Sequence, residues 1–280
     1  MSELLVQHTC SLAPDGTVYH MLDYQGLLNP TQYLAVSAPD GPLMVVAGPG
    51  SGKTRVLTYR VAYLIESGAD PRRIVALTFT NKAAAELSSR LRDVLGTATT
   101  AGTFHSVAAR LLRRYAPQLG IGSDFSILDS SDSAKVVRDL CARLIPDLVA
   151  VDGKNLVAKL RKDISLAKNN GIQASQVTDP TTALIFDAYE KYLFSINALD
   201  FDDLLVKFLM LRHTPVADEV AGLFDHVLVD EYQDTNSVQE QIVDFLAPHH
   251  RITVVGDPDQ SIYAFRGAQP AVMEGFPRKH

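Results

Sequence analysis

Short apolar runs of strand length alternate along the chain with longer stretches in which apolar residues recur at helical spacing. The strand-length runs cover residues 43–47, 74–80, 99–103, 224–230 and 251–256. Helical stretches follow the first three runs, after Gly52, from Asn81 and from Ser106. Strands that alternate with helices are typical of a parallel sheet joined by crossover helices. The pattern therefore predicts an α/β fold built on a parallel sheet.

Two parts of the chain depart from this alternation. Residues 116–197 are helical in pattern and predict an inserted helical subdomain, which divides the sheet domain into residues 28–115 and 198–280. Within the insertion we expect helices at 134–144, 154–168 and 181–195, the first of them capped by Ser133. Residues 1–27 lack sustained periodicity and contain a turn-like Pro14-Asp15-Gly16, so we interpret them as a poorly specified leader.

Composition and charge limit the classes of protein to which this chain can belong. The chain has 280 residues, of which 46% are hydrophobic and 21% charged, as in ordinary globular proteins. It has neither an apolar run of about 18 residues nor a signal peptide, so we expect a cytoplasmic protein without a membrane span. A net charge of -6 argues against a broad basic face for duplex DNA but leaves room for a narrow single-strand track. Cys10 and Cys141 match no metal spacing and predict no redox role.

A glycine-rich loop follows the first apolar run and precedes a helix. It reads, in order, Ala47, Gly48, Pro49, Gly50, Ser51, Gly52, Lys53 and Thr54. Glycines let the backbone amides of such a loop face phosphate oxygens, while Lys53 reaches the outer phosphates and Thr54 holds Mg²⁺. Ala47 stands where the strict pattern has glycine, and its small side chain keeps the turn. The loop predicts an ATP site with Mg²⁺ rather than a chance glycine turn.

Two acids follow the apolar run at 227–229 and are expected to act at the same site as the glycine-rich loop. Asp230 is expected to bind Mg²⁺, and Glu231 to accept the proton of the water that attacks the terminal phosphate. An apolar strand that ends in Asp-Glu is, alone, more often a solvated strand end. Paired with Lys53, the catalytic interpretation is the better one.

Several segments, in order, resemble the UvrD/PcrA/Rep type of superfamily 1 DNA helicases. The segment 28–32 resembles the Q motif, in which Gln32 would read adenine. Without the other motifs, a helix start with proline in its first turn would be the preferred, simpler interpretation. Arg55 matches an additional phosphate contact of the family. The segments 200–203 and 230–236 resemble the family's Asp-Phe-Asp-Asp stretch and its extended motif II, with Tyr232 where phenylalanine is commoner.

The same resemblance implies a track for single-stranded DNA. Phe79 and Asn81 lie in a stretch similar to motif Ia, and Thr103 and His105 in one similar to motif Ib. Taken alone, Phe79 would be a core residue and His105 a structural histidine. The stretch 255–268 resembles motif III, the most family-specific segment of the chain. It implies that Gln260 senses the terminal phosphate and that Tyr263 and Phe265 stack on bases. Arg266 would then couple the phosphate site to the DNA bases.

The resemblance implies a RecA-like motor domain, the ATP-binding N-terminal half of a helicase that moves along single-stranded DNA or DNA with a single-stranded tail. In the family a second RecA-like domain follows, and it would have to act here in cis or in trans. We therefore expect the 280 residues alone to bind nucleotide weakly and to hydrolyse it barely above background. A nucleotide-gated DNA-binding module or subunit without turnover is the alternative. A metabolic P-loop ATPase would leave residues 260–266 unexplained.

Overall fold

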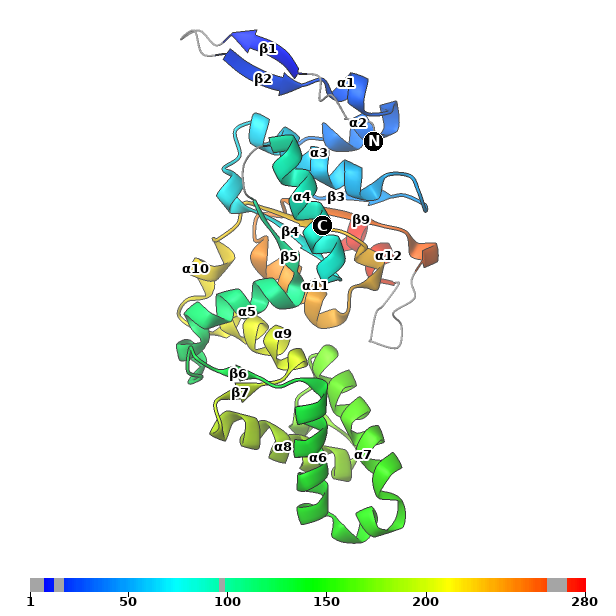
Figure 1. The fold of residues 1–280 in the computed structure, drawn as a ribbon, viewed down its shortest axis with the longest axis vertical. Helices are drawn as coiled ribbons and strands as arrows, with labels where there is room; N and C mark the ends of the chain where they lie inside the picture. The colour runs from blue at the N-terminus through cyan, green and yellow to red at the C-terminus, as the bar shows by residue number, and fades with distance from the viewer. Residues whose placement is uncertain (1–7, 13–17, 96–98, 261–270) are drawn as a thin grey trace.

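A computed structural model describes residues 8–12, 18–95, 99–260 and 271–280. Its centre is a parallel sheet of five strands in the order β3-β9-β8-β4-β5 (Figure 1). The strands are β3 (Leu43–Val46), β4 (Ile74–Thr78), β5 (Thr100–Thr103), β8 (His226–Val229) and β9 (Ile252–Gly256). The three inner strands are buried along their whole length, as strands covered on both faces must be. The predicted α/β class is confirmed.

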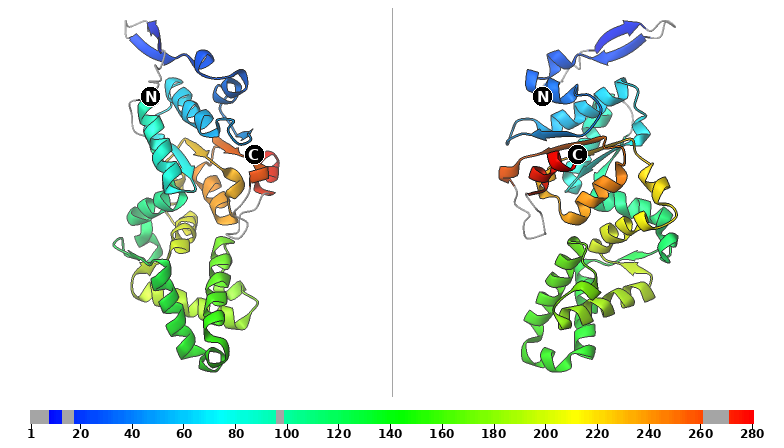
Figure 2. Two further views of the ribbon diagram at one scale, coloured as in Figure 1. Left: turned by 45° about the vertical axis from the view of Figure 1, so that its right-hand side comes forward. Right: turned by 180° about the vertical axis from the view of Figure 1, so that it is seen from behind.

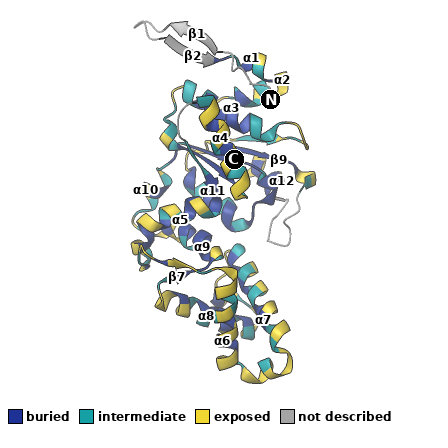
Figure 3. Cartoon of the chain, in the orientation of Figure 1, coloured by how far each residue is buried: buried dark blue, intermediate teal, exposed yellow. Residues whose placement is uncertain are grey.

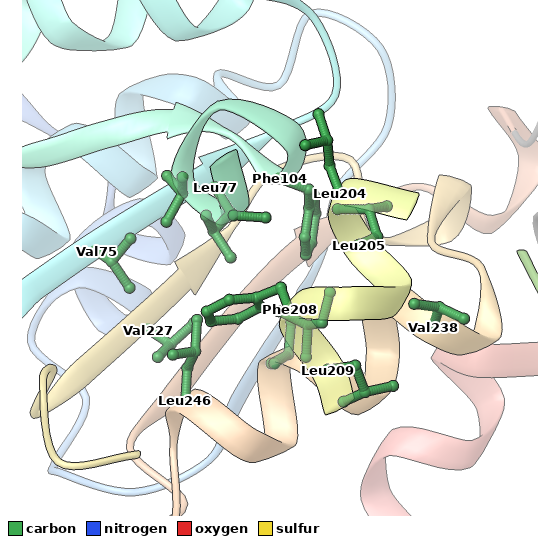
Figure 4. Close-up of a cluster of buried hydrophobic side chains, with 14 of the residues drawn as sticks. Val75, Leu77, Phe104, Leu204, Leu205, Phe208, Leu209, Val227, Val238 and Leu246 are labelled. Carbon is green, nitrogen blue, oxygen red and sulfur yellow. The ribbon is translucent and has the colours of Figure 1, made fainter. Parts of the chain in front are cut away.

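Helices cover both faces of this sheet. One face packs against α3 (Lys53–Glu66) and α4 (Asn81–Leu95). The other packs against α5 (Phe104–Tyr115), α9 (Phe201–Met210), α11 (Ser237–Leu246) and α12 (Ala271–Lys279). Alternate residues of β4 go to the two faces: Val75 and Leu77 join the α5 side, whereas Ile74 and Ala76 join the α3 side. Figure 4 shows Phe208 of α9 among Val75, Val227 and Leu246 in the larger of these cores.

The helical insertion forms a second core of its own. It consists of α6 (Ser130–Leu144), α7 (Pro146–Asn169) and α8 (Pro180–Ser195), whose facing sides are buried while their outer sides are exposed (Figure 3). The short parallel strands β6 (Ser126–Ile127) and β7 (Ala198–Leu199) lie where the chain enters and leaves it. Ile121 and Phe125 pack with the sheet domain. The domain boundaries at 116 and 197 stay predictions.

Two details of the insertion differ from the sequence-based expectation. Helix α6 begins at Ser130, and its N-cap is Asp129, whose carboxylate accepts from the amides of Ser131 and Asp132. The expectation that Ser133 caps this helix was wrong, because Asp129, four residues before Ser133, satisfies the first amides and also complements the helix dipole. Helix α7 is longer than expected but kinks at Asp152, so its second segment does begin near residue 154.

The described part of the leader is structured. Strands β1 (His8–Leu12) and β2 (Val18–Leu22) form an antiparallel pair, followed by the short helices α1 (Tyr24–Leu27) and α2 (Pro30–Val36). Leu22 and Tyr24 are buried against α2 and α3, and the Tyr24 hydroxyl donates to Glu66 at 2.8 Å. The pair β1–β2 and the insertion lie at opposite ends of an elongated molecule (Figure 2). A five-residue helix, α10 (Ala217–Ala221), completes the described α-helices.

Candidate functional site

The glycine-rich loop connects β3 to α3 at the carboxyl edge of the sheet. Gly50 and Gly52 have φ values of 71° and 88°, a left-handed region in which side chains with a Cβ are strained. A Cβ on Gly52 would also lie 2.8 Å from Nε2 of Gln32. The Ala47 amide donates to the Gly256 carbonyl at 3.0 Å and thereby anchors the loop to β9. The residues expected to wrap a phosphate therefore form an exposed loop at the start of a helix of fourteen residues.

The loop and the two acids meet although they are far apart in the sequence. Nζ of Lys53 lies 2.7 Å from Oε2 of Glu231, and Oγ1 of Thr54 lies 3.4 Å from Oδ2 of Asp230. This follows from the parallel sheet, because β3 and β8 flank β9 and all three strands end at the same edge. The four groups named from the sequence thus form one cluster.

The Asp230 carboxyl is buried, and its environment favours a positive ion beside it. Burial, followed by the neighbouring charge of Glu231, raises the pKa of Asp230 to about 6. Asp230 and Thr54 offer only oxygen atoms, which are the ligands that Mg²⁺ prefers. Magnesium commonly binds through one or two carboxylates together with substrate phosphates and water, so these residues fit that ion.

The backbone of Glu231 is unusual. It has φ 51° and ψ 44°, the left-handed helical region, which a residue with a side chain rarely adopts. Its amide donates to Oδ1 of Asp230 at 3.0 Å, and its side chain turns toward Lys53. Such strain costs about 1 to 3 kcal/mol and persists only where the surroundings impose it. The buried residues on either side hold this carboxylate at the phosphate loop.

Gln233 joins Glu231 to the segment after β9, a contact that the sequence did not reveal. Its Nε2 donates to Oε2 of Glu231 at 2.9 Å, and its Oε1 accepts from the Asp257 amide at 2.9 Å. A Cβ on Gly256 would lie 2.6 Å from that Oε1, so a larger residue there would displace the Gln233 side chain. Gln260, expected at the terminal phosphate, donates from Nε2 to Oδ2 of Asp257. The buried Gln233 side chain therefore links the segment that carries Glu231 to the segment that carries Gln260.

Two residues expected at the nucleotide are engaged with protein groups. The Gln32 side chain accepts from the Asn29 amide and donates to the Ser51 carbonyl at 2.9 Å. It therefore belongs to a capping box with proline at the first helical turn, the simpler of the two interpretations, and also contacts the phosphate loop. The Arg55 guanidinium donates to the Leu27 carbonyl at 2.7 Å. Both side chains would have to turn to reach a nucleotide, so their predicted contacts remain predictions.

Two of the expected DNA contacts line one open cleft of about 530 Å³. Phe79 and His105 line it, together with Thr80 at the end of β4 and Lys162 and Leu166 on α7. Phe79 is partly buried and its ring lies 5.5 Å from that of Phe104, so it borders both the core and the cleft. A sheet edge, one helix of the insertion and α9 thus enclose a groove with aromatic walls.

The remaining residues of the expected track differ in position. Asn81 is exposed at the first turn of α4. Thr103 is buried and its hydroxyl accepts from the Ser106 amide as the N-cap of α5, so it shapes the start of that helix instead of facing the cleft. Tyr263, Phe265 and Arg266 lie outside the described residues.

Phe201 is an aromatic wall of the cleft that the sequence did not single out. Its ring is 58% exposed and stacks on His105, with ring centroids 4.1 Å apart and planes 22° apart. The resemblance had identified its segment only as the family's Asp-Phe-Asp-Asp stretch. The position of Phe201 among three acids, at 200, 202 and 203, does not by itself show that the side chain is exposed.

No helix in the part of the chain that the structure describes is long and apolar enough to cross a membrane.

Three curated relatives are ATP-dependent DNA helicases: PcrA of Bacillus subtilis (strain 168), UvrD1 of Mycobacterium leprae (strain TN) and PcrA of Staphylococcus aureus (strain Mu50). They are 40%, 39% and 37% identical to this chain over 90%, 98% and 86% of its length. The chain spans 36%, 38% and 34% of their lengths.

The sequence also matches a protein family over nearly all of its described fold. The match covers residues 28–280 and is to the UvrD/REP helicase N-terminal domain. It includes the phosphate loop, the two acids, the insertion and the walls of the cleft. On this match and on the identity to its relatives, the chain belongs to the UvrD/REP helicase family, as its N-terminal domain.

Proposed function

We propose that this chain binds ATP with Mg²⁺ at the phosphate loop and single-stranded DNA in the cleft, as the first motor domain of a UvrD-like helicase. In that enzyme, ATP hydrolysis would drive movement along one DNA strand in the cytoplasm. The observation that carries the proposal is the convergence of Lys53 and Thr54 with Asp230 and Glu231, pairs of groups that lie 176 to 178 residues apart in the sequence. The relatives are ATP-dependent DNA helicases, which supports the same activity.

The geometry suggests a role for each group at the nucleotide. Lys53 binds the outer phosphate oxygens, and Thr54 and Asp230 hold Mg²⁺, which when bound neutralises charge on the transferred phosphate. Glu231 accepts the proton of the attacking water as Lys53 leaves it for the phosphates. Gln260, held by Asp257, would report on the terminal phosphate.

The cleft suits a single strand better than a duplex. Phe79, His105 and Phe201 offer ring faces, and a base stacked on such a ring contributes about 1 to 3 kcal/mol whatever its identity. Lys162 adds a cation on the insertion side. Tyr263, Phe265 and Arg266 would extend this track, and a second RecA-like domain, in cis or in trans, would supply the arginines for the transition state.

Binding measurements test the proposal on residues 1–280. Calorimetry should detect ATP only when Mg²⁺ is present, and fluorescence anisotropy should show tighter binding of an oligothymidine than of a duplex of equal length. Absence of both interactions would refute the proposal. Steady-state ATPase assays with and without oligothymidine, repeated with a second RecA-like domain added in trans, then separate an enzyme from a nucleotide-gated binding module, which would bind both ligands without turnover in either case.

A further inference from the structure

A row of polar side chains joins the helical insertion to the segment that follows the catalytic acids. Nδ2 of Asn236 donates to Oδ1 of Asn169 at 2.7 Å, and Nδ2 of Asn169 donates to Oδ1 of Asp202 at 2.9 Å. The three residues come from the start of α11, the end of α7 and the first turn of α9, which meet between the sheet domain and the insertion (Figure 1). Each bond in the row therefore crosses from one element to another.

The chemistry of the row requires an amide at position 169. The Asn236 Oδ1 already accepts from the Gln239 amide as a helix cap, which leaves its Nδ2 to face Asn169. When it is ionised, Asp202 can only accept, and Asn169 then donates on that side and accepts on the other. A carboxylate at 169 would repel Asp202, and alanine would leave both neighbours without this bond.

An ion cluster fixes the end of α7 and so fixes Asn169. Lys168 is almost wholly buried, with its Nζ 2.8 Å from Asp200 and 2.8 Å from Asp203. Burial alone would lower the pKa of Lys168, but Asp203 and Asp200 outweigh it and raise that pKa, so the ammonium stays charged. Because both acids belong to the capping box of α9, helices α7 and α9 cannot slide past one another without breaking buried ion pairs.

The row lines the candidate DNA cleft and leads toward the phosphate site. Asn169, Asp202 and Asn236 line the same cleft as Phe201 and His105. From Asn236, the chain runs back to Glu231 through a short 3₁₀ helix, Tyr232–Asp234, and Thr235, all of them buried. Closely packed interiors transmit displacement because they contain few voids that could absorb it. A shift of α7 caused by a ligand in the cleft would therefore be felt at the catalytic acids.

We propose that Asn169 is a positioning residue through which single-stranded DNA in the cleft changes the affinity of the phosphate site for ATP. The proposal rests on the proposed function, since it requires both ligands to bind this chain. By linkage, the factor by which DNA changes the ATP affinity equals the factor by which ATP changes the DNA affinity. The same coupling factor is thus measurable from either side, which provides an internal check.

The test measures this factor in residues 1–280 and in matched variants. The affinity for a fluorescent, non-hydrolysable ATP analogue with Mg²⁺ is determined with and without saturating oligothymidine, and the affinity for labelled oligothymidine with and without the analogue. For the unaltered chain we expect a factor of about 5 to 150 in both directions. Asn169→Ala should bring the factor close to one while leaving the analogue affinity without DNA unchanged. Melting temperatures verify that each variant is folded.

Two further variants distinguish loss of this hydrogen-bonded row from a general loss of structure. Asn170→Ala changes the next amide, which donates to the Leu166 carbonyl of its own helix, and should keep the coupling factor. Asn236→Asp keeps the acceptor that caps α11 but removes the donor to Asn169, and should lower the factor as Asn169→Ala does. The double variant Asn169→Ala/Asn236→Asp should show no additional loss of coupling, because both changes break the same hydrogen bond, between Asn236 and Asn169.

The outcomes distinguish failure of this inference from failure of the proposed function. Unchanged coupling in Asn169→Ala would overturn the inference, and so would an unaltered chain that binds both ligands with no effect of one on the other. In both cases the proposed function would stand. An unaltered chain that binds neither ligand would instead refute the proposed function, and the inference with it.

Discussion

The Lys53 ammonium and the Glu231 carboxylate form an ion pair with 2.7 Å between Nζ and Oε2, and their side chains are 10% and 41% exposed. The cation expected on the phosphates and the base expected on the attacking water thus hold one another. ATP must take Lys53 away from this carboxylate before it can bind as proposed. Removing the Lys53 cation should therefore weaken ATP binding, whereas removing the Glu231 charge should not.

Replacing each partner separately tests this relationship. Lys53→Ala should weaken binding of ATP with Mg²⁺ by about 10- to 100-fold, because charged hydrogen bonds contribute about 1.5 to 3 kcal/mol. Glu231→Gln should bind ATP as tightly as the unaltered chain, or up to about fivefold more tightly, because partly exposed ion pairs contribute up to about 1 kcal/mol. Titration calorimetry gives both constants. Equal weakening in the two variants would contradict the assigned roles.

The left-handed backbone at Glu231 predicts an inverted order of stability for two small residues. Glu231→Gly should be more stable to urea than Glu231→Ala by about 1 kcal/mol, because only alanine pays the steric cost of a Cβ there. Asp139, exposed within α6, serves as the control. There the glycine variant should be the less stable by about 1 kcal/mol, as in ordinary helices. The same order at both positions would mean that residue 231 is not held at φ 51° in solution.

The stacked ring of Phe201 should contribute to binding more than to folding. Phe201→Ala is expected to weaken oligothymidine binding by about 1 to 3 kcal/mol while the melting temperature changes little. Phe194 is 62% exposed on α8 outside the cleft, so Phe194→Ala should leave the affinity unaltered. Anisotropy titrations measure the affinities and calorimetric scans the stabilities. A large loss of stability in Phe201→Ala, with DNA affinity retained, would identify the ring as a packing element.

The buried cluster around Lys168 predicts a stability defect that depends on pH. Lys168→Met leaves Asp200 and Asp203 buried together without their cation, which should cost about 3 to 5 kcal/mol at pH 8. Burial already raises the pKa of Asp203 to about 6 with Lys168 present. An acid whose pKa is higher in the folded state destabilises the fold above that pKa, and the penalty disappears as pH falls below it. The defect should therefore be smaller at pH 5 than at pH 8.

Urea denaturation of the variant and of the unaltered chain at both pH values measures this difference. Lys154→Met, at an exposed position of the same helix, is the control and should be neutral at both. A defect of Lys168→Met that is equal at pH 5 and pH 8 would show that the two carboxyls do not take up protons when the cation is removed.

The sequence predicted those parts of the fold that local pattern determines. The strands of the central sheet were found because strands buried on both faces are continuous apolar runs, as β4 and β8 are. The strands β1 and β2 were not found, since their sequences HTCSL and VYHML contain no run of this kind. The cap of α6 was misplaced within a run of possible capping residues, among which spacing alone cannot choose.

The contacts of the candidate site could likewise be predicted from the sequence only in part. That Lys53 and Glu231 would meet could be predicted, because parallel strands bring their carboxyl ends to one edge. The contacts of Gln233, Phe201 and Asn169 could not be, because each depends on how elements distant in sequence pack together. Nothing in the spacing of residues 169, 202 and 236 indicates that their side chains form a row. The track residues Tyr263, Phe265 and Arg266 stay predictions.

The order of strands in the sheet also constrains how the chain folds during its synthesis. Within the described sheet β3 is an edge strand that pairs with β9 alone, and Leu43 lies opposite Thr253. The strand that carries the phosphate loop thus leaves the ribosome on the order of 200 residues before its partner, a delay of tens of seconds at about 5 to 20 residues per second. Until then its backbone donors and acceptors have no neighbour in the sheet. The nascent chain should therefore acquire its nucleotide site only as a late event.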